Sequence, residues 1–358
     1  SDGQLLFLQH MLYHMRPAEE GGSRVAIVMN GSPLFTGDAG SGESEIRRWM
    51  LENDWVEAIV ALPEQLFYNT SIATYIWVLS NRKASHRKGK VQLIDASEIW
   101  EPMRKSLGDK RREIKPEGIQ QITALYHDYQ ENKQSKIFDS SEFGFRKIRV
   151  ERPLRMNFQA SPERIENLKE DRTFQKLAES RKRDLEKKQH EIEEGRRKQK
   201  AILEMLIELE PIVYQDVERF REVFKAEAEL RGIQLYAATR DAIVDALGER
   251  DEEAEIRVDR QGRPEPDPDL RDYENVPLGE DIEEYFGREV NPYVPEAWID
   301  EEYTDDRDGE IGRVGYEINF NRYFYEYVPP RPLEEIQAEI IELQDEIFEL
   351  LTEVTNGE

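Results

Sequence analysis

The spacing of apolar residues predicts a helix at the start of the chain. Leu5, Leu8 and Leu12 recur at helical intervals, and the neighbouring Phe7 and Tyr13 widen the apolar surface. The sequence therefore predicts a helix that is largely buried. Because a domain seldom begins inside its own core, we expect further sequence upstream of this helix.

Short apolar runs then predict strands, as in an α/β fold. These runs cover residues 25–29, 56–62, 74–79 and 91–94. The first is continuously apolar, which is typical of a strand covered on both faces. Only the eleven residues 63–73 separate the second strand from the third, fewer than a parallel crossover needs, so we expect these two strands to be antiparallel.

Helical patterns dominate the rest of the chain. A helix is predicted over 119–129, a short β-like stretch over 143–150, and another helix over 239–247. Residues 161–210 form a charged helical segment with sparse apolar positions. Such a narrow apolar face on a helix is more typical of a helical hairpin or stalk than of a globular core.

The last helix carries a heptad pattern. Its apolar residues are spaced by 3, 4, 3, 4 and 3 positions, as in the seam of a coiled coil: Leu333, Ile336, Ile340, Leu343, Ile347 and Leu350. Two interpretations remain open. The helix packs on its own domain, or it pairs with a helix from elsewhere in the chain or from another subunit.

Composition narrows the possible chemistry. The 358 residues include no cysteine, which excludes disulfides, cysteine-ligated zinc, iron–sulfur clusters and a thiol nucleophile. No apolar run approaches the roughly 20 residues of a membrane span. We therefore expect a cytoplasmic protein with no membrane partner.

Charge is distributed unevenly along the chain. Of the net charge of -26, residues 249–310 contribute most, with 24 acidic and 7 basic side chains. Residues 82–115 hold 11 basic and 5 acidic side chains, and a second basic cluster comprises Arg146, Lys147, Arg149, Arg152 and Arg155. A DNA partner is therefore compatible with this acidic chain. The acidic segment could form solvated loops, mimic DNA charge or meet a basic partner.

Two motifs are weak indications of a metal site and of a phosphate-binding loop. His10 and His14 have the spacing of a metal pair on one helix, but the sequence offers no obvious third ligand, so no metal site is expected. The glycine-rich residues 37–42 precede a helix and could cradle a phosphate. They lack the P-loop ending and the GxGxxG spacing, so a connecting loop is the better interpretation.

The loop over residues 66–72 is a stronger candidate. It lies between two predicted strands and places Phe67 and Tyr68 beside the small polar residues Asn69 and Thr70. Aromatic rings at a loop tip can stack on an exposed nucleic-acid base. A hydrophobic plug beneath the loop fits the same residues equally well.

At this loop the chain resembles a known family. The modification (methyltransferase) subunit of type I restriction-modification systems, an N6-adenine DNA methylase, is similar to this chain over residues 22–35, 46–48, 59–63, 66–74 and 88–96. Residues 273–278 and 315–325 resemble the tail of its longer members. The resemblance implies the C-terminal half of a Rossmann-like S-adenosylmethionine-dependent methyltransferase domain, followed by a mainly α-helical tail with a coiled-coil C-terminal helix.

The resemblance also implies an activity. It implies methyl transfer from S-adenosylmethionine to N6 of an adenine flipped out of double-stranded DNA, with Phe67 or Tyr68 stacking on the base and Asn69 and Thr70 supporting the loop. The family's cofactor motif and its N-P-P-[FY] motif occur nowhere in the chain, so no catalytic residue is assigned. The chain alone is predicted to be inactive, whereas the intact subunit is active.

Partners follow from the same resemblance. They are DNA, a DNA-specificity subunit, a second modification subunit and a restriction subunit, with the heptad helix as the assembly surface. Candidate contacts to the DNA backbone are Arg87, Lys88, Lys90, Arg111 and Arg112. The alternative is a non-catalytic coiled-coil interaction protein built on a truncated methyltransferase fold.

The expected organisation has five segments. They are a catalytic half-domain (1–100), a basic connecting region with a helix and short strands (101–160), a charged helical stalk (161–248), an acidic, partly irregular tail region (249–330) and the assembly helix (331–358).

Overall fold

The computed structural model describes residues 3–259, 261–327 and 329–355. The chain forms two compact units. Unit 1 combines Ser1–Phe143 with Tyr316–Glu358, and unit 2 is formed by Gly144–Gly315. The chain therefore leaves unit 1 at Phe143, builds all of unit 2 and returns at Tyr316. The fold is mixed α/β, and its two units divide the chain differently from the five expected segments.

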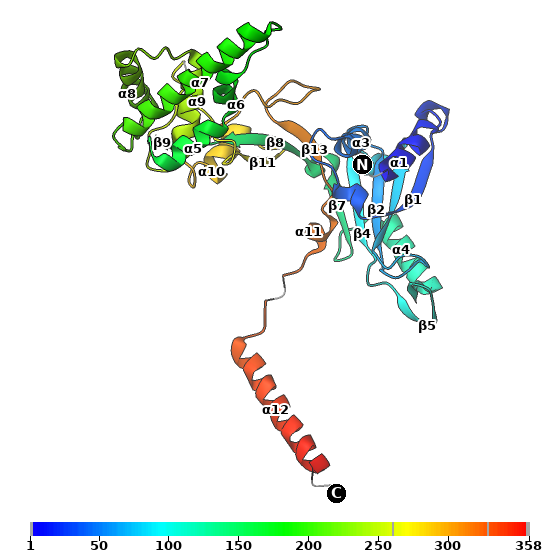
Figure 1. Cartoon of the computed structure of the whole chain (residues 1–358). Helices are drawn as coiled ribbons and strands as arrows, with labels where there is room; N and C mark the ends of the chain where they lie inside the picture. The colour runs from blue at the N-terminus through cyan, green and yellow to red at the C-terminus, as the bar shows by residue number, and fades with distance from the viewer. Residues whose placement is uncertain (1–2, 260, 328, 356–358) are drawn as a thin grey trace. The chain divides into compact units, whose positions relative to one another are not determined.

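Unit 1 is built on a five-stranded sheet with the order β1-β3-β2-β4-β7 (Figure 1). Its strands are β1 (Arg24–Asn30), β2 (Val56–Leu62), β3 (Thr74–Ser80), β4 (Lys90–Asp95) and β7 (Ser135–Asp139). β3 runs antiparallel to both β1 and β2, which confirms the predicted antiparallel pair. β2 and β4 are parallel, and β7 is antiparallel to β4.

Helices and one hairpin complete unit 1. The helices are α1 (Gln4–Tyr13), α2 (Ser32–Phe35), α3 (Gly42–Glu52), α4 (Pro116–Asp128), α11 (Phe320–Phe324) and α12 (Leu333–Thr355), with short 3-10 turns η1 (Ala18–Glu20), η2 (Ser85–Arg87) and η3 (Ser140–Phe143). β5 (Glu101–Leu107) and β6 (Lys110–Glu113) form a separate antiparallel hairpin. α4 packs Ile122, Leu125 and Tyr126 against Val60 and Ile94 of the sheet.

Two predictions about the first elements are wrong. In α1, Leu5, Leu8 and Leu12 are buried, but Phe7 and Tyr13 are exposed, so the helix is not largely buried. β1 is an edge strand paired only with β3 in the described residues, and several of its side chains are exposed, so it is not covered on both faces. By contrast, every residue of β2 is buried, because β2 lies between β3 and β4 in the sheet.

Unit 2 contains a helical core. Its helices are α5 (Pro162–Glu170), α6 (Arg172–Gln175), η4 (Lys176–Ala178), α7 (Leu185–Glu208), α8 (Val217–Leu230) and α9 (Ala237–Leu247), which lie together in Figure 1. A short ladder of β9 (Met156–Phe158) and β10 (Gly248–Arg250) lies beside them in sequence. Phe158, Leu168, Leu206, Phe220 and Ile243 belong to one buried cluster. The segment expected as a stalk is therefore several helices, most of which share a core with α8 and α9.

The other part of unit 2 is a small sheet. β8 (Gly144–Glu151) pairs with β11 (Asp272–Pro277), β12 (Trp298–Ile299) and β13 (Arg313–Tyr316). Together with α10 (Ile282–Glu289) it encloses a second apolar cluster that includes Ile148, Val276 and Phe286. Three short strands of this sheet, β11, β12 and β13, come from the segment expected as an acidic, partly irregular tail region. In the part of the chain that the structure describes, no helix is long and apolar enough to cross a membrane.

Candidate nucleic-acid interface

The candidate loop joins β2 to β3 at one edge of the unit 1 sheet. Thr74 pairs with both Asn30 and Leu62, and Asp95 pairs with Ala61, so the carboxyl ends of β1, β2 and β4 meet at this edge. In open α/β sheets, ligands bind outside the carboxyl ends of the strands. The loop is therefore placed where a substrate could reach it.

The base of the loop is fixed and its tip is exposed. Leu66 packs against the apolar cluster of β2, β4 and α4. The amide of Gln65 donates to the carbonyl of Ser71 at 3.3 Å, and Phe67 forms a β-bridge with Thr70. Leu66 is thus the plug under the loop, and the residues after it form a tight turn.

Phe67 and Tyr68 differ in exposure. Phe67 is half-buried, whereas the side chain of Tyr68 is 64% exposed. The Lys110 ammonium lies 5.5 Å from the centre of the Tyr68 ring, within the range of a cation–π interaction. Asn69 is exposed, and the Thr70 hydroxyl accepts a hydrogen bond from the Ile72 amide at 3.4 Å. Tyr68 therefore offers its ring to solvent, and Phe67 is held within the turn.

The β5–β6 hairpin holds this loop through its backbone. The amide of Asp109 donates to the carbonyl of Tyr68 at 3.0 Å. The amides of Arg111 and Arg112 both donate to the carbonyl of Gln65, at 3.0 and 3.2 Å. Sequence reasoning missed this contact, since nothing in the hairpin sequence indicates which loop its backbone will meet.

The predicted DNA-backbone residues lie in different environments. Arg111 and Lys88 are exposed. Lys90 pairs with Asp139 at 2.7 Å on the sheet surface. The guanidinium of Arg112 lies 3.9 Å from the centre of the Trp100 ring. The structure thus places Arg111 and Arg112 on the hairpin beside the loop, Lys88 just before β4, and Lys90 at the first position of β4.

Arg87 is not available to DNA, contrary to the prediction. Its side chain is 6% exposed and lies 3.7 Å from the carboxylate of Glu57, which is itself buried on β2. Its guanidinium also donates to Gln92 at 3.0 Å and lies over the rings of Tyr126 and Tyr129. Because these partners come from β2, β4 and α4, the local basic run gave no sign that Arg87 points inward.

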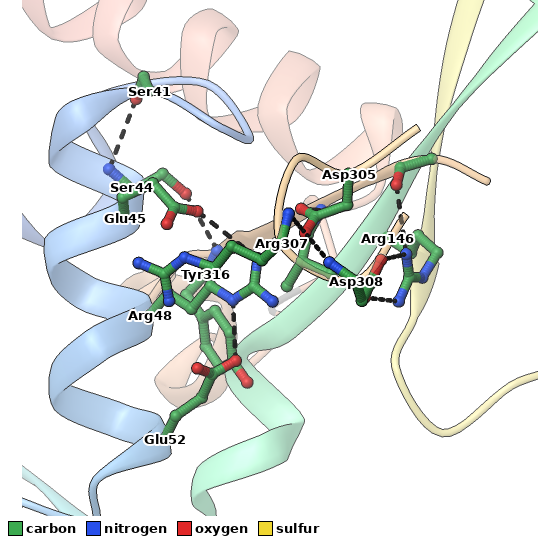
Figure 2. Close-up of polar contacts among 12 residues, drawn as sticks. Ser41, Ser44, Glu45, Arg48, Glu52, Arg146, Asp305, Arg307, Asp308 and Tyr316 are labelled. Carbon is green, nitrogen blue, oxygen red and sulfur yellow. Dashed lines mark hydrogen bonds and ion pairs between the residues drawn. The ribbon is translucent and has the colours of Figure 1, made fainter. Parts of the chain in front are cut away.

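Three arginines of the second basic cluster, Arg146, Arg149 and Arg155, pair with carboxylates of the acidic segment within unit 2. Arg146 pairs with Asp308 at 2.7 Å (Figure 2). It also pairs with Glu310 at 3.1 Å. Arg149 pairs with Asp300. Further ion pairs join Arg155 to Glu296, Arg271 to Glu151 and Arg250 to Asp267. The hydrogen bond from Arg146 lowers the pKa of Asp308. Much of the acidic segment therefore meets the chain's own arginines.

Arg47 is a buried residue that sequence reasoning missed. Its guanidinium donates to four carbonyl oxygens, those of Tyr316, Thr36, Pro33 and Gly37, at 2.5, 2.6, 3.2 and 3.3 Å. The amide of Tyr316 in turn donates to the hydroxyl of Ser44 at 3.3 Å (Figure 2). These bonds fasten the returning end of unit 1 to α3.

The residues described do not fit a nucleotide cofactor at the glycine-rich loop. Arg47 donates to the carbonyl of Gly37, and a Cβ added at Gly37 would lie 2.4 Å from the hydroxyl of Ser41, so the loop is filled by its own chain. The first turn of α3 is capped by Ser41 and carries Glu43 and Glu45, which oppose an anion. The loop therefore has no place for a phosphate or for S-adenosylmethionine.

The histidine pair does not form a metal site either. His10 and His14 lie edge to face, with ring centres 4.6 Å apart. Across residues 3–259, 261–327 and 329–355, no group of three or more histidine or acidic side chains could hold a metal ion.

Comparison with known proteins shows which family the first part of the chain resembles. Residues 1–150 match the family described as N-6 DNA Methylase. The resemblance inferred from the sequence is therefore confirmed.

Curated relatives similar to part of the chain are methylase subunits of type I restriction enzymes. The type I restriction enzyme MjaIX methylase subunit of Methanocaldococcus jannaschii is 31% identical over 144 residues, covering 40% of this chain and 23% of the relative. The HindI methylase subunit of Haemophilus influenzae is 43% identical over 93 residues, covering 26% of this chain and 19% of the relative. The chain thus spans about a quarter or less of the length of these relatives.

A solved structure is also similar to part of the chain. The methyltransferase subunit of a type I restriction-modification system from Streptococcus thermophilus has 26% identity, covers 40% of this chain and 28% of that protein, and gives a TM-score of 0.34.

Proposed function

We propose that this chain carries part of the catalytic domain of a DNA adenine-N6 methyltransferase, the modification subunit of a type I restriction-modification system. The observation that carries the proposal is the exposed ring of Tyr68 on a braced loop at the carboxyl edge of the unit 1 sheet. It lies within the 150 residues that match the N-6 DNA methylase family. Methylation by such a subunit would mark host DNA and protect it from restriction.

The sheet supports a Rossmann-like half-domain in this proposal. β2 and β4 are parallel, and β3 is inserted antiparallel between β1 and β2. The resemblance implies a Rossmann-like sheet with a terminal antiparallel pair, and the antiparallel pairing of β3 with β2 agrees with it.

Tyr68 rather than Phe67 would hold the flipped adenine. A base moved out of the duplex loses its stacking, and an aromatic face at the loop tip replaces it. Tyr68 presents most of its surface to solvent, whereas Phe67 is half-buried in the turn. Asn69 and Thr70 would keep the tip in shape, since Thr70 already bonds the Ile72 amide.

The methyl donor in this family is S-adenosylmethionine, which supplies the electrophilic methyl group. The glycine-rich loop offers no fit for it, and the two motifs expected to bind it and to grip the adenine amine are absent from the sequence. The part played by this chain would therefore be to receive and orient the target base.

The proposed partners are double-stranded DNA, a DNA-specificity subunit, a second modification subunit and a restriction subunit, in the cytoplasm. The seam of α12 is the proposed assembly surface. Its residues Leu333, Ile340, Leu343, Ile347 and Leu350 are exposed. Pairing with another helix would bury them at a gain of roughly 1.5–3 kcal/mol for each side chain fully covered, before association costs.

The test uses the protein encoded by the full gene together with its specificity subunit. Tyr68→Ala should lower adenine methylation on the order of tenfold to a hundredfold, because stacking contributes about 1–3 kcal/mol per base. Tyr68→Phe keeps the ring and should retain most of the activity. The matched control is Ile72→Ala, which removes an exposed apolar side chain from the same loop.

Two results would contradict the proposal. Unchanged methylation in Tyr68→Ala would remove the assignment of this residue. A gene that encodes neither the cofactor motif nor the N-P-P-[FY] motif would remove the enzymatic function itself.

A further inference from the structure

The β5–β6 hairpin concentrates positive charge beside the Tyr68 loop. Residues 104–112 contain five basic side chains and one acidic side chain in a protein whose net charge is -26. Arg104, Lys105 and Arg111 are exposed. Among the described residues, none of these three has a carboxylate partner. Their charge is therefore available to an external anion.

This pattern differs from the two basic stretches that contain Arg87 and Arg146. Arg87 is buried against Glu57, and Arg146 and Arg149 are neutralised by aspartates of unit 2. The exposed side chains of Arg104, Lys105 and Arg111 have no carboxylate partner within the described ranges, whereas Arg87, Arg146 and Arg149 each pair with one. A polyanion is the ligand that such a surface would attract.

The hairpin is also fastened to the candidate base-binding residue. The Asp109 amide donates to the carbonyl of Tyr68, and Gly108 lies so close that an added Cβ would be 2.6 Å from the same oxygen. Gly108 has φ +62, a left-handed conformation that favours glycine. The turn of the hairpin is therefore in direct backbone contact with the tip of the loop.

We propose that the β5–β6 hairpin is a phosphate-binding arm. Arg104, Lys105 and Arg111 would contact the DNA backbone next to the flipped adenine, and Gly108 would be a positioning residue that sets Tyr68 against the base. The inference rests on the proposed function, since it takes the loop to receive a base. The inference adds that the two events are coupled: DNA phosphates that bind the β5–β6 hairpin also fix the position of the Tyr68 ring.

The first experiment measures how DNA affinity depends on salt. The triple variant Arg104→Ala/Lys105→Ala/Arg111→Ala is made in the full complex with its specificity subunit. Each phosphate contact that is lost should reduce the slope of log affinity against log salt by about 0.9. The control triple, Arg181→Ala/Arg183→Ala/Lys188→Ala, removes the same charge from exposed residues of unit 2. It should leave the slope unchanged.

The second experiment tests the positioning role of Gly108. Gly108→Ala should reduce the fluorescence rise of 2-aminopurine placed at the target adenine, with little change in the salt slope, because the backbone shift displaces the ring and removes no charge. Gly232→Ala is the matched control, since Gly232 has φ +66 and nothing within 4 Å of an added Cβ. It should leave both readouts unchanged.

The outcomes separate this inference from the proposed function. Equal slopes for the hairpin triple and the wild type, or equal losses in both triples, would overturn the phosphate arm. Equal fluorescence in Gly108→Ala and Gly232→Ala would overturn the coupling. If Tyr68→Ala still lowers methylation as predicted in either case, the proposed function stands without the arm. If Tyr68→Ala has no effect while the hairpin triple lowers the slope, the base-stacking assignment fails and the hairpin remains a DNA contact.

Discussion

Arg87 and Glu57 form an ion pair inside unit 1, with 3.7 Å between the Nε and Oε1 atoms and side chains that are 6% and 1% exposed. Glu57 also accepts from the Tyr126 hydroxyl at 2.5 Å and pairs with Arg24 at 3.2 Å. One carboxylate on β2 therefore links β1, α4 and the turn before β4. Because Glu57 is buried, its partner Arg87 is held inside unit 1 and cannot reach an external anion.

Glu57→Gln should destabilise the protein strongly. The substitution keeps the size of the side chain but leaves the Arg87 guanidinium buried without a counter-charge, which costs about 3–5 kcal/mol. The free energy of unfolding in denaturant measures the loss. The control is Glu166→Gln, which breaks an exposed pair with Lys169 and should cost less than about 1 kcal/mol. Similar losses in the two variants would contradict the structural role of the pair.

The Tyr126 phenol should make stability depend on pH in the alkaline range. Burial, with the hydrogen bond to Glu57, raises its pKa from 10.0 to about 12. The unfolded chain therefore releases this proton first, so the stabilising contribution is complete below pH 10 and is lost as the pH rises towards 12. The free energy of unfolding should fall less steeply over this range in Tyr126→Phe. Identical slopes would show that Tyr126 is not responsible.

Arg149→Ala/Arg155→Ala should not weaken DNA binding. Both arginines are paired within unit 2, to Asp300 and Glu296, so their removal frees carboxylates but releases no phosphate contact. The slope of DNA affinity against salt should equal that of the wild type, whereas the denaturation midpoint should fall. A reduced slope would mean that these arginines exchange their carboxylates for DNA.

Ile340→Asp/Ile347→Asp should prevent the proposed assembly through α12. Both side chains are about half exposed, at 51% and 55%, so the folded chain loses little while a heptad partner would lose its apolar contact. Light scattering after gel filtration measures the mass of the complex. Gln337→Asp/Gln344→Asp introduces the same charge at exposed polar positions and should leave the mass unchanged. A loss of assembly in both variants would point to charge rather than to the seam.

Local pattern was sufficient for most elements of unit 1. The short spacing between β2 and β3 correctly predicted their antiparallel pairing, because too few residues separate them for a crossover. The aromatic loop was also located correctly between two strands. The spacing of apolar residues could not predict which apolar side chains are exposed. Leu5 and Phe7 lie on one helix with opposite burial, and only the tertiary contacts decide which side is covered.

The errors on the basic residues have one physical cause. A run of cations looks alike in sequence whether its partners are water, DNA or distant carboxylates. Arg87 is paired with Glu57 from another strand, and Arg146 with Asp308, which comes much later in the chain. The aspartates that neutralise unit 2 and the carbonyls that surround Arg47 are equally remote in sequence. Such contacts between residues far apart in the sequence could be identified only from the three-dimensional structure.

The path of the chain through unit 1 has an evolutionary consequence. The amide of Glu317 donates to the carbonyl of Phe143 at 2.9 Å, so the points where the chain departs from unit 1 and comes back to it touch each other. Everything between them is a module held at its two ends, with apolar cores of its own. A module attached in this way can be gained, exchanged or deleted by recombination without altering the sheet that carries Tyr68.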